Sequence, residues 1–254
     1  MDLFVRESGP VGAPAVVFLH GGLMSGWTWE PVVMRMQHYH CLVPDLPQYG
    51  KSFQHGPFEM GRAAEAVAEL IRTRVSAGRA HLVGFSLGAQ VGVQLLATQP
   101  QLIDRAVLSS TFINTWPAVP LTRRLAGLAA RATLLRWLLI TRHWDTHHAA
   151  QNPGYRDDAR LNSGAQLAHI AMASAGFTVP RGLDTSYVPT LFVTGSEELR
   201  VIRRWAAALA RPMPNGVDRL AQGMRHDWPL HNPDLFARTA DAWLSLSPLP
   251  SAIV

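Results

Sequence analysis

Short runs of consecutive apolar residues recur along this chain, separated by longer segments in which apolar residues return every three or four positions. Continuous apolar runs are typical of strands covered on both faces, and the wider spacing is typical of helices with one buried face. The runs predict strands at residues 3–7, 15–20, 40–45, 80–85, 103–109, 188–195 and 217–220. The other segments predict helices at residues 27–36, 63–75, 87–98, 202–209 and 233–246. This alternation predicts an α/β fold with a mostly parallel, doubly wound sheet.

Residues 114 to 187 interrupt the alternation, because no apolar run of strand length occurs there. Helical spacing at residues 121–137 and 165–173 lies on either side of a polar stretch at residues 143–162. Helices inserted between one strand and a later strand are typical of a cap over the carboxyl edge of a sheet. The sequence therefore predicts an α/β core at residues 1–113 and 186–254, with a helical cap at residues 114–185 inserted before the penultimate strand.

The composition indicates a globular chain. Of its 254 residues 48% are hydrophobic, which is enough for one sizeable core and a cap. The single Cys41 lies in an apolar run, so we expect a core residue and no internal disulfide. The chain has no signal-peptide pattern and no apolar stretch of about 18 residues, so we expect a cytoplasmic protein that does not bind a membrane.

The formal net charge of +5 at pH 7 raises the question of nucleic-acid binding. The basic residues, however, are nearly all arginine and are scattered along the chain. The densest groups, at residues 123–136 and 200–204, are typical of solvated helix faces and not of a basic stripe with interleaved aromatic rings. We therefore expect no nucleic-acid partner.

A serine stands where a predicted strand meets a predicted helix, in the pattern Gly84-x-Ser86-x-Gly88. Such a corner holds its middle residue in a strained backbone conformation, and glycine two positions away on either side removes a steric collision. The alternative is that Ser86 is an ordinary helix N-cap. Because a strand precedes the serine and a helix follows it, we favour a nucleophile.

A serine nucleophile needs a base within hydrogen-bond reach and a third group that orients the base. In the chain order Ser, acid, His, the acid follows a later strand and the histidine lies in a loop before the last helix. Glu198 and His226 occupy those positions. Glu197 is the alternative acid, since only one of two adjacent glutamates can face the histidine. Asp45 lies in a turn, where we expect it to bind backbone donors.

Three histidines in the predicted cap could hold a metal on one helix face, because His143, His147 and His148 include an i, i+4 pair. No carboxylate motif such as His-Glu-x-x-His accompanies them. We expect a surface or cap-lining cluster, no metal site and no cofactor.

Several motifs resemble those of the α/β-hydrolase fold superfamily, over nearly the whole chain. His20-Gly21-Gly22 resembles its anion-hole turn, residues 44–52 its Asp-x-x-Gly-x-Gly-x-Ser loop, and residues 84–88 its nucleophile elbow. Residues 189–198 are similar to its segment that ends in Gly-x-x-Asp, with glutamate in the place of aspartate. Residues 223–233 are similar to its Gly-x-x-His loop.

This resemblance implies a triad of Ser86, His226 and Glu198, with the backbone N–H groups of Gly22 and Leu87 as the oxyanion hole. It also favours residue 198 over its neighbour as the acid. Serine at the elbow argues against the superfamily's epoxide hydrolases and haloalkane dehalogenases, because those enzymes use a carboxylate nucleophile.

We therefore expect a serine hydrolase that cleaves a carboxylic ester of a small to medium apolar molecule through an acyl-enzyme. The expected substrate contacts are Leu23, Trp116, Trp137, Met172 and Trp228. The alternative for such apolar residues is that they pack the cap onto the core. Hydrolysis of a carbon–carbon bond, a lactone or a thioester, cyanohydrin cleavage, and a ligand receptor with little turnover stay open. The partner we expect is a small-molecule ester, and a monomer and a homodimer are equally compatible with the sequence.

Overall fold

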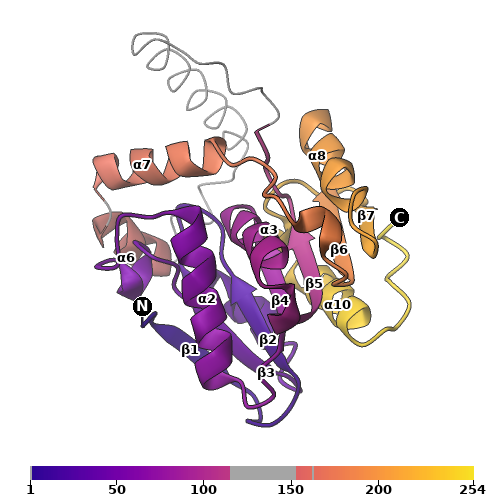
Figure 1. The fold of residues 1–254 in the computed structure, drawn as a ribbon, viewed down its shortest axis with the longest axis horizontal. Helices are drawn as coiled ribbons and strands as arrows, with labels where there is room; N and C mark the ends of the chain where they lie inside the picture. Colours follow the sequence, from indigo (N-terminus) through magenta and orange to yellow (C-terminus); the bar gives the residue numbers. More distant parts are fainter. Residues whose placement is uncertain (1, 115–152, 162) are drawn as a thin grey trace.

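The computed structural model describes residues 2–114, 153–161 and 163–254, which form a seven-stranded sheet covered by helices (Figure 1). The strands are β1 (Val5–Ser8), β2 (Ala15–Leu19), β3 (His40–Pro44), β4 (Ala80–Phe85), β5 (Ile103–Ser109), β6 (Thr190–Gly195) and β7 (Gly216–Ala221). Their order in the sheet is β1-β3-β2-β4-β5-β6-β7. Strand β1 is antiparallel to β3, and the other neighbouring pairs are parallel. The predicted mostly parallel sheet is confirmed.

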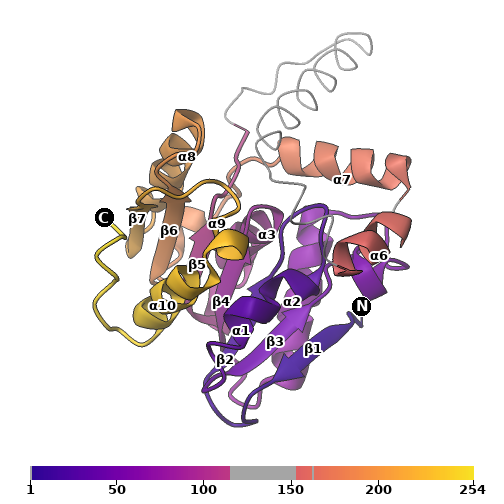
Figure 2. The same cartoon turned by 180° about the vertical axis from the view of Figure 1, so that it is seen from behind.

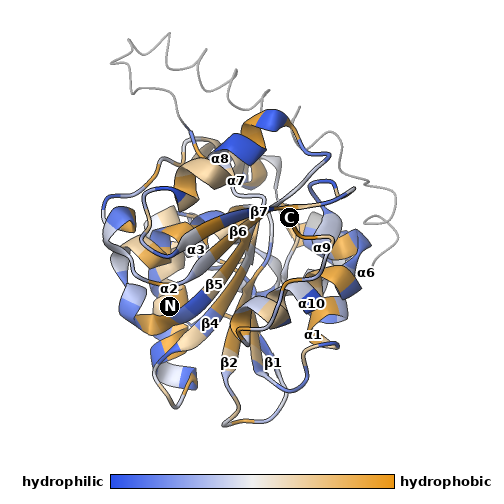
Figure 3. Ribbon diagram, turned by 90° about the vertical axis from the view of Figure 1, so that its right-hand side faces the viewer, coloured by the Kyte–Doolittle hydropathy of each residue, from blue (hydrophilic) through white to orange (hydrophobic). Residues whose placement is uncertain are grey.

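Alternate residues of the central strands face opposite sides of the sheet, which explains their continuous apolar runs. In β2, Val17 and Leu19 pack into the core on one side, and Val16 and Phe18 pack into the core on the other. Figure 3 shows these hydrophobic strands between two layers of helices.

Different helices cover the two faces of the sheet. One face is covered by α2 (Met60–Arg74), α3 (Leu87–Thr98) and α8 (Arg200–Ala210). The other is covered by α1 (Glu30–Val33), α9 (Trp228–His231) and α10 (Pro233–Leu244), as Figure 2 shows. Within the described ranges, no helix is long and apolar enough to cross a membrane.

The helix predicted at residues 27–36 is shorter than expected. It begins as a 3₁₀ turn, Gly26–Trp29, and continues as the single turn of α1. Beyond α1, Arg35 and Met36 donate to carbonyls only three residues back. The apolar spacing is therefore buried by a series of tight turns and not by one α-helix. The helix predicted at residues 121–137 lies outside the described residues.

Two described helices, α6 (Pro153–Leu161) and α7 (Gly164–Ala175), lie between β5 and β6 in the chain. Asp158 ties α6 to the rest of the fold, because its Oδ2 accepts a hydrogen bond from Trp27 Nε1 at 2.7 Å. Gln90 Nε2 on α3 donates to the Ser174 carbonyl of α7 at 2.8 Å. Both helices belong to the predicted cap, whose boundaries stay a prediction since residues 115–152 lie outside the described part of the chain.

Candidate active site

Ser86 stands at the corner between β4 and α3, with a left-handed φ of +53°. The flanking glycines make this corner possible. A Cβ on Gly84 would lie 2.8 Å from Gly88 O, and one on Gly88 would collide with the Leu19 carbonyl. The Ser86 side chain makes no capping hydrogen bond to α3. The expected strand, turn and helix are present, and the hydroxyl is left for another partner.

His226 lies between Ser86 and Glu198. It is in the loop between β7 and α9, and Glu198 follows β6. His226 Nε2 is 3.3 Å from Ser86 Oγ, and His226 Nδ1 is 2.9 Å from Glu198 Oε2. Because a carboxylate only accepts hydrogen bonds, the proton on the imidazole lies on Nδ1, and Nε2 is left to accept from the serine hydroxyl. Three residues far apart in the chain therefore form one hydrogen-bonded relay.

Glu198 is buried, and both of its oxygens have partners. Oε1 accepts from the backbone N–H of Gly195 at 2.8 Å and from the Ser110 hydroxyl at 2.7 Å. Glu197 is exposed, and its Oε2 lies 3.1 Å from Nε of Arg225 at the surface. The structure thus brings Glu198 to the histidine and turns its neighbour toward solvent.

Ser110 is part of this arrangement but was not predicted. It follows β5, is fully buried and has a left-handed φ of +57°. Its Oγ lies 3.3 Å from Ser109 Oγ, which accepts from Trp228 Nε1 at 3.0 Å. An acid is the residue type expected to orient His226, so a hydroxyl residue after this strand was not expected to take part. The usable signal was a polar pair at the end of a buried strand, at the sheet edge that carries Ser86.

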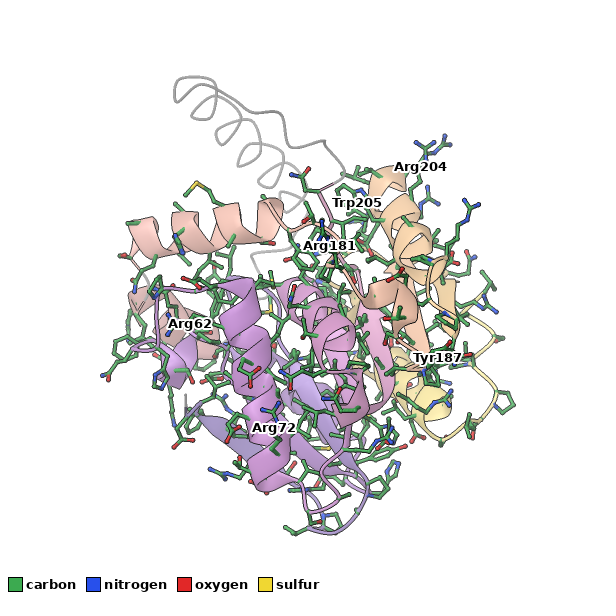
Figure 4. All side chains as sticks on the ribbon, in the orientation of Figure 1. Arg62, Arg72, Arg181, Tyr187, Arg204 and Trp205 are labelled. Atoms are coloured by element: carbon green, nitrogen blue, oxygen red, sulfur yellow. The ribbon has the colours of Figure 1, made fainter. Side chains whose placement is uncertain are left out.

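Aromatic rings support the His226 imidazole from two sides. Its centroid is 5.2 Å from that of Phe85 and 5.1 Å from that of Phe112. Phe112 packs in turn against Trp205 of α8, which Figure 4 labels, at 5.9 Å. This packing limits the rotation of the ring and keeps its two nitrogens aligned with their partners.

A small hollow that is partly open to solvent adjoins Ser86 and His226. Its lining combines backbone of the turn after β2 with apolar side chains of the core and of α7: Gly22, Leu23, Tyr49, Phe85, Ser86, Leu87, Leu167, Ile170, Ala171, Ser174 and His226. None of these described residues is Asp, Glu, Lys or Arg. The hollow therefore suits an uncharged, mostly apolar group.

Only one of the predicted substrate contacts in the described residues lines the hollow. Leu23 lines the hollow, and its contact with a substrate stays a prediction. Met172 does not, because it is 44% exposed and follows Ala171 on α7, so its side chain points about 100° away from that of Ala171. Trp228 does not either, because it is 1% exposed and packs in the core. Trp116 and Trp137 lie outside the described residues.

The turn predicted to form the oxyanion hole approaches the residue after Ser86. A Cβ on Gly22 would lie 4.0 Å from Leu87 Cβ and 3.6 Å from Tyr49 Oη. The next residue, Leu23, has a left-handed φ of +65°. The turn therefore brings Gly22 close to Leu87 at the hollow, and their role as an oxyanion hole stays a prediction.

His20 fixes this turn as a neutral ring. Leu46 N–H donates to His20 Nε2 at 2.9 Å, so that nitrogen carries no proton. His20 Nδ1 then donates to Gly21 O at 2.8 Å. Burial lowers the pKa of His20 from 6.5 to about 4, although the Asp45 carboxylate opposes the shift. The imidazole therefore bridges the turn after β2 and the loop after β3.

This burial makes stability depend on pH. Between pH 6.5 and about 4, His20 is protonated in the unfolded chain but stays neutral in the folded chain. The free energy of unfolding therefore falls as the pH is lowered through this range. The contribution is on the order of 3 kcal/mol across that window. Denaturant titrations at pH 7 and pH 4.5 should show a smaller pH effect in His20→Gln than in the unmodified protein. An equal pH effect in both proteins would contradict this assignment.

Asp45 has the structural role expected for it. Its Oδ1 accepts from Gly26 N–H at 2.8 Å and from Arg6 Nη1 at 2.6 Å. Its Oδ2 accepts from Lys51 N–H at 2.9 Å. The carboxylate thus joins β1 to the loops that follow β2 and β3.

The expectation of no metal site is tested only in part. In residues 2–114, 153–161 and 163–254, no group of three or more His, Cys, Asp or Glu is arranged to hold a metal ion. The predicted histidine cluster, His143, His147 and His148, lies outside these ranges.

Known proteins share this sequence pattern and architecture. The family model described as alpha/beta hydrolase fold matches residues 14–178, more than half of the chain. An AB hydrolase superfamily protein of Gibberella zeae is 26% identical, over 98% of this chain and 86% of its own. A pimeloyl-[acyl-carrier protein] methyl ester esterase of Yersinia pseudotuberculosis is 24% identical, over 88% of this chain and 90% of its own.

A solved structure agrees with the family match. The enol-lactonase from Burkholderia xenovorans LB400 superposes with a TM-score of 0.72 at 20% identity, over 96% of each chain. At that identity the superposition shows a shared fold and nothing about function. With the family model, the sheet order and the strained serine corner together, the chain belongs to the alpha/beta hydrolase fold family.

Proposed function

We propose that this protein is a serine hydrolase that cleaves a carboxylic ester through an acyl-enzyme. The observation that carries the proposal is the relay from Glu198 through His226 to Ser86 at the edge of an uncharged hollow. The 3.3 Å separation between His226 Nε2 and Ser86 Oγ is long for a hydrogen bond to a hydroxyl, as is common before substrate binds.

In the proposed mechanism, Ser86 Oγ attacks the ester carbonyl carbon and its proton passes to His226 Nε2. The Glu198 carboxylate stabilises the imidazolium through Nδ1–H. The backbone N–H groups of Gly22 and Leu87 bind the oxyanion of the tetrahedral intermediate. His226 returns the proton to the departing alkoxide oxygen, which leaves as the alcohol. A water then attacks the acyl-enzyme by the same route, and the acid is released from Ser86.

The substrate class follows from the lining of the hollow. Leu23, Leu167 and Ile170 surround the space beside Ser86, which favours small to medium apolar acyl groups. The name of one relative, a pimeloyl-[acyl-carrier protein] methyl ester esterase, supports ester chemistry in this family. The proposed reaction needs water as its only co-substrate and no cofactor.

A panel of substrates tests the proposal. p-Nitrophenyl esters of increasing acyl length should turn over, with the highest kcat/KM at short or medium length because the hollow is small. Turnover of a diketone, thioester or cyanohydrin without ester turnover would overturn the ester as substrate, while the catalytic role of the relay would stand. No turnover of any member would favour a ligand receptor instead.

Ser110 is expected to tune this reaction through Glu198. Replacing Ser110 with alanine removes one of the two hydrogen bonds to Glu198 Oε1 and should lower kcat by about 10-fold. The pH profile of kcat/KM should shift in Ser110→Ala, because the carboxylate that faces His226 is altered. A purely structural role would lower activity without moving the profile.

A further inference from the structure

The Tyr49 hydroxyl lies in the hollow beside the turn that we assign to the oxyanion hole. Tyr49 follows β3, is 1% exposed and contributes to the lining. Its Oη lies 3.6 Å from the position of a Cβ on Gly22. Its ring packs edge-on against His20, with centroids 5.0 Å apart. The phenol is therefore held firmly beside the proposed reaction centre.

The proton of this hydroxyl is available to a bound molecule. The Leu23 backbone lies beside the hydroxyl and partly opposes the rise in the Tyr49 pKa that burial causes. Burial raises the pKa of Tyr49, so the phenol keeps its proton. In the described part of the chain, the other interaction found for the hydroxyl is a longer-range electrostatic one with Asp158. The O–H can therefore donate to a group that enters the hollow.

Most neighbours of this hydroxyl in the hollow are apolar side chains, such as Leu23, Leu87 and Ile170. In such a site, a bound molecule that displaces water without offering an acceptor leaves the O–H unpaired. A buried donor without a partner is costly, so the site discriminates against that molecule. The Tyr49 hydroxyl, with mostly apolar side chains around it, thus acts as a selector.

The geometry of the proposed reaction indicates which part of the substrate meets Tyr49. The leaving oxygen must face His226 Nε2 to receive its proton. The carbonyl oxygen must lie between the N–H groups of Gly22 and Leu87. Tyr49 Oη is next to Gly22. A substituent that lies alongside the carbonyl oxygen, on the first carbon of the acyl group, would reach it.

We propose that Tyr49 is a specificity residue that selects acyl groups with an oxygen acceptor on the carbon next to the scissile carbonyl, such as alkoxyacetyl or 2-oxoacyl groups. This inference rests on the proposed esterase function and names its preferred substrate class.

The test uses two esters with the same leaving group and the same number of heavy atoms, p-nitrophenyl methoxyacetate and p-nitrophenyl butyrate. In Tyr49→Phe, kcat/KM for the methoxyacetate should fall on the order of 10-fold more than kcat/KM for the butyrate. The ratio of ratios cancels the intrinsic reactivity of the two esters. A merely structural role for the hydroxyl, acting through Leu23 and the turn, would lower both values equally and would overturn the inference.

A second measurement does not depend on the variant folding. In the unmodified protein, the ratio of kcat/KM for methoxyacetate to that for butyrate should exceed the ratio of their hydroxide-catalysed rate constants. A ratio at or below the hydroxide value would also overturn the inference. If the unmodified protein hydrolyses neither ester, the proposed function itself fails and the selectivity inference falls with it. Loss of selectivity alone leaves the proposed function intact.

Discussion

Replacing Ser86 with alanine is expected to lower kcat for p-nitrophenyl esters by about 10⁴- to 10⁶-fold. The reason is that the proposed acyl-enzyme cannot form without Oγ, while binding and the oxyanion donors leave only a small residual rate. The substitution should leave the fold intact, because the Ser86 side chain makes no capping bond to α3 and its strained backbone is held by the glycines on either side.

The matched control for this variant is Ser76→Ala, which changes an exposed serine beyond the end of α2. Its kcat/KM should stay within about 2-fold of the unmodified value, as is usual for exposed sites. Initial rates of p-nitrophenolate release at saturating ester measure both variants. A loss of less than about 10-fold in Ser86→Ala would contradict nucleophilic catalysis by Ser86.

Glu198→Gln should lower kcat by about 10³- to 10⁴-fold, whereas Glu197→Gln should stay within about 2-fold. Glu198 Oε2 accepts from His226 Nδ1, and an amide nitrogen in its place would favour the wrong tautomer of the imidazole. Glu197 meets only Arg225 among its described charged neighbours, at the surface, where an ion pair contributes little.

The two glutamine variants form a matched pair, because they make the same chemical change at adjacent positions. Steady-state kinetics on one ester, with a melting curve for each variant, separates loss of catalysis from loss of fold. Equal losses in the two variants, or a larger loss in Glu197→Gln, would refute the assignment of Glu198 as the acid.

The parts of this molecule that could be predicted from its sequence are governed by local physics. The central strands are recognisable because both of their faces are buried, and the serine corner because its sterics require glycine at positions 84 and 88. The partners of Ser86 could be predicted because parallel strands bring their carboxyl ends to one edge. Chain order alone then points to the loops that carry Glu198 and His226.

Contacts between distant segments were much harder to predict. Ser110 and Tyr49 matter because of where their hydroxyls lie relative to Glu198 Oε1 and the turn at Gly22, and no pattern in the chain encodes those positions. Trp228 was expected to contact the substrate, but its ring is buried in the core and its indole N–H donates to Ser109 Oγ. Burial of a large aromatic ring outweighed proximity to the catalytic loop.

Gln48 illustrates how a departure from a pattern is accommodated. The resemblance suggested that Tyr49 replaces a glycine of the Asp-x-x-Gly-x-Gly-x-Ser loop, but counting from Asp45 puts Gln48 at the first glycine. The φ of +65° at Gln48 is one that glycine adopts easily. Its Oε1 accepts from Phe58 N–H at 2.5 Å, so the side chain gains a buried partner that glycine could not have. That hydrogen bond offsets part of the backbone strain, which on its own costs about 1 kcal/mol or more.

The measurement that tests the central claim most directly is peptide mapping after reaction with a p-nitrophenyl alkylphosphonate, which reacts with an activated serine and stays bound. The account predicts that the phosphonyl group is found on Ser86, that ester turnover falls in proportion to labelling, and that labelling is at least 10³-fold slower in Glu198→Gln. Labelling of another residue with loss of activity, or complete labelling of Ser86 with turnover intact, would contradict it.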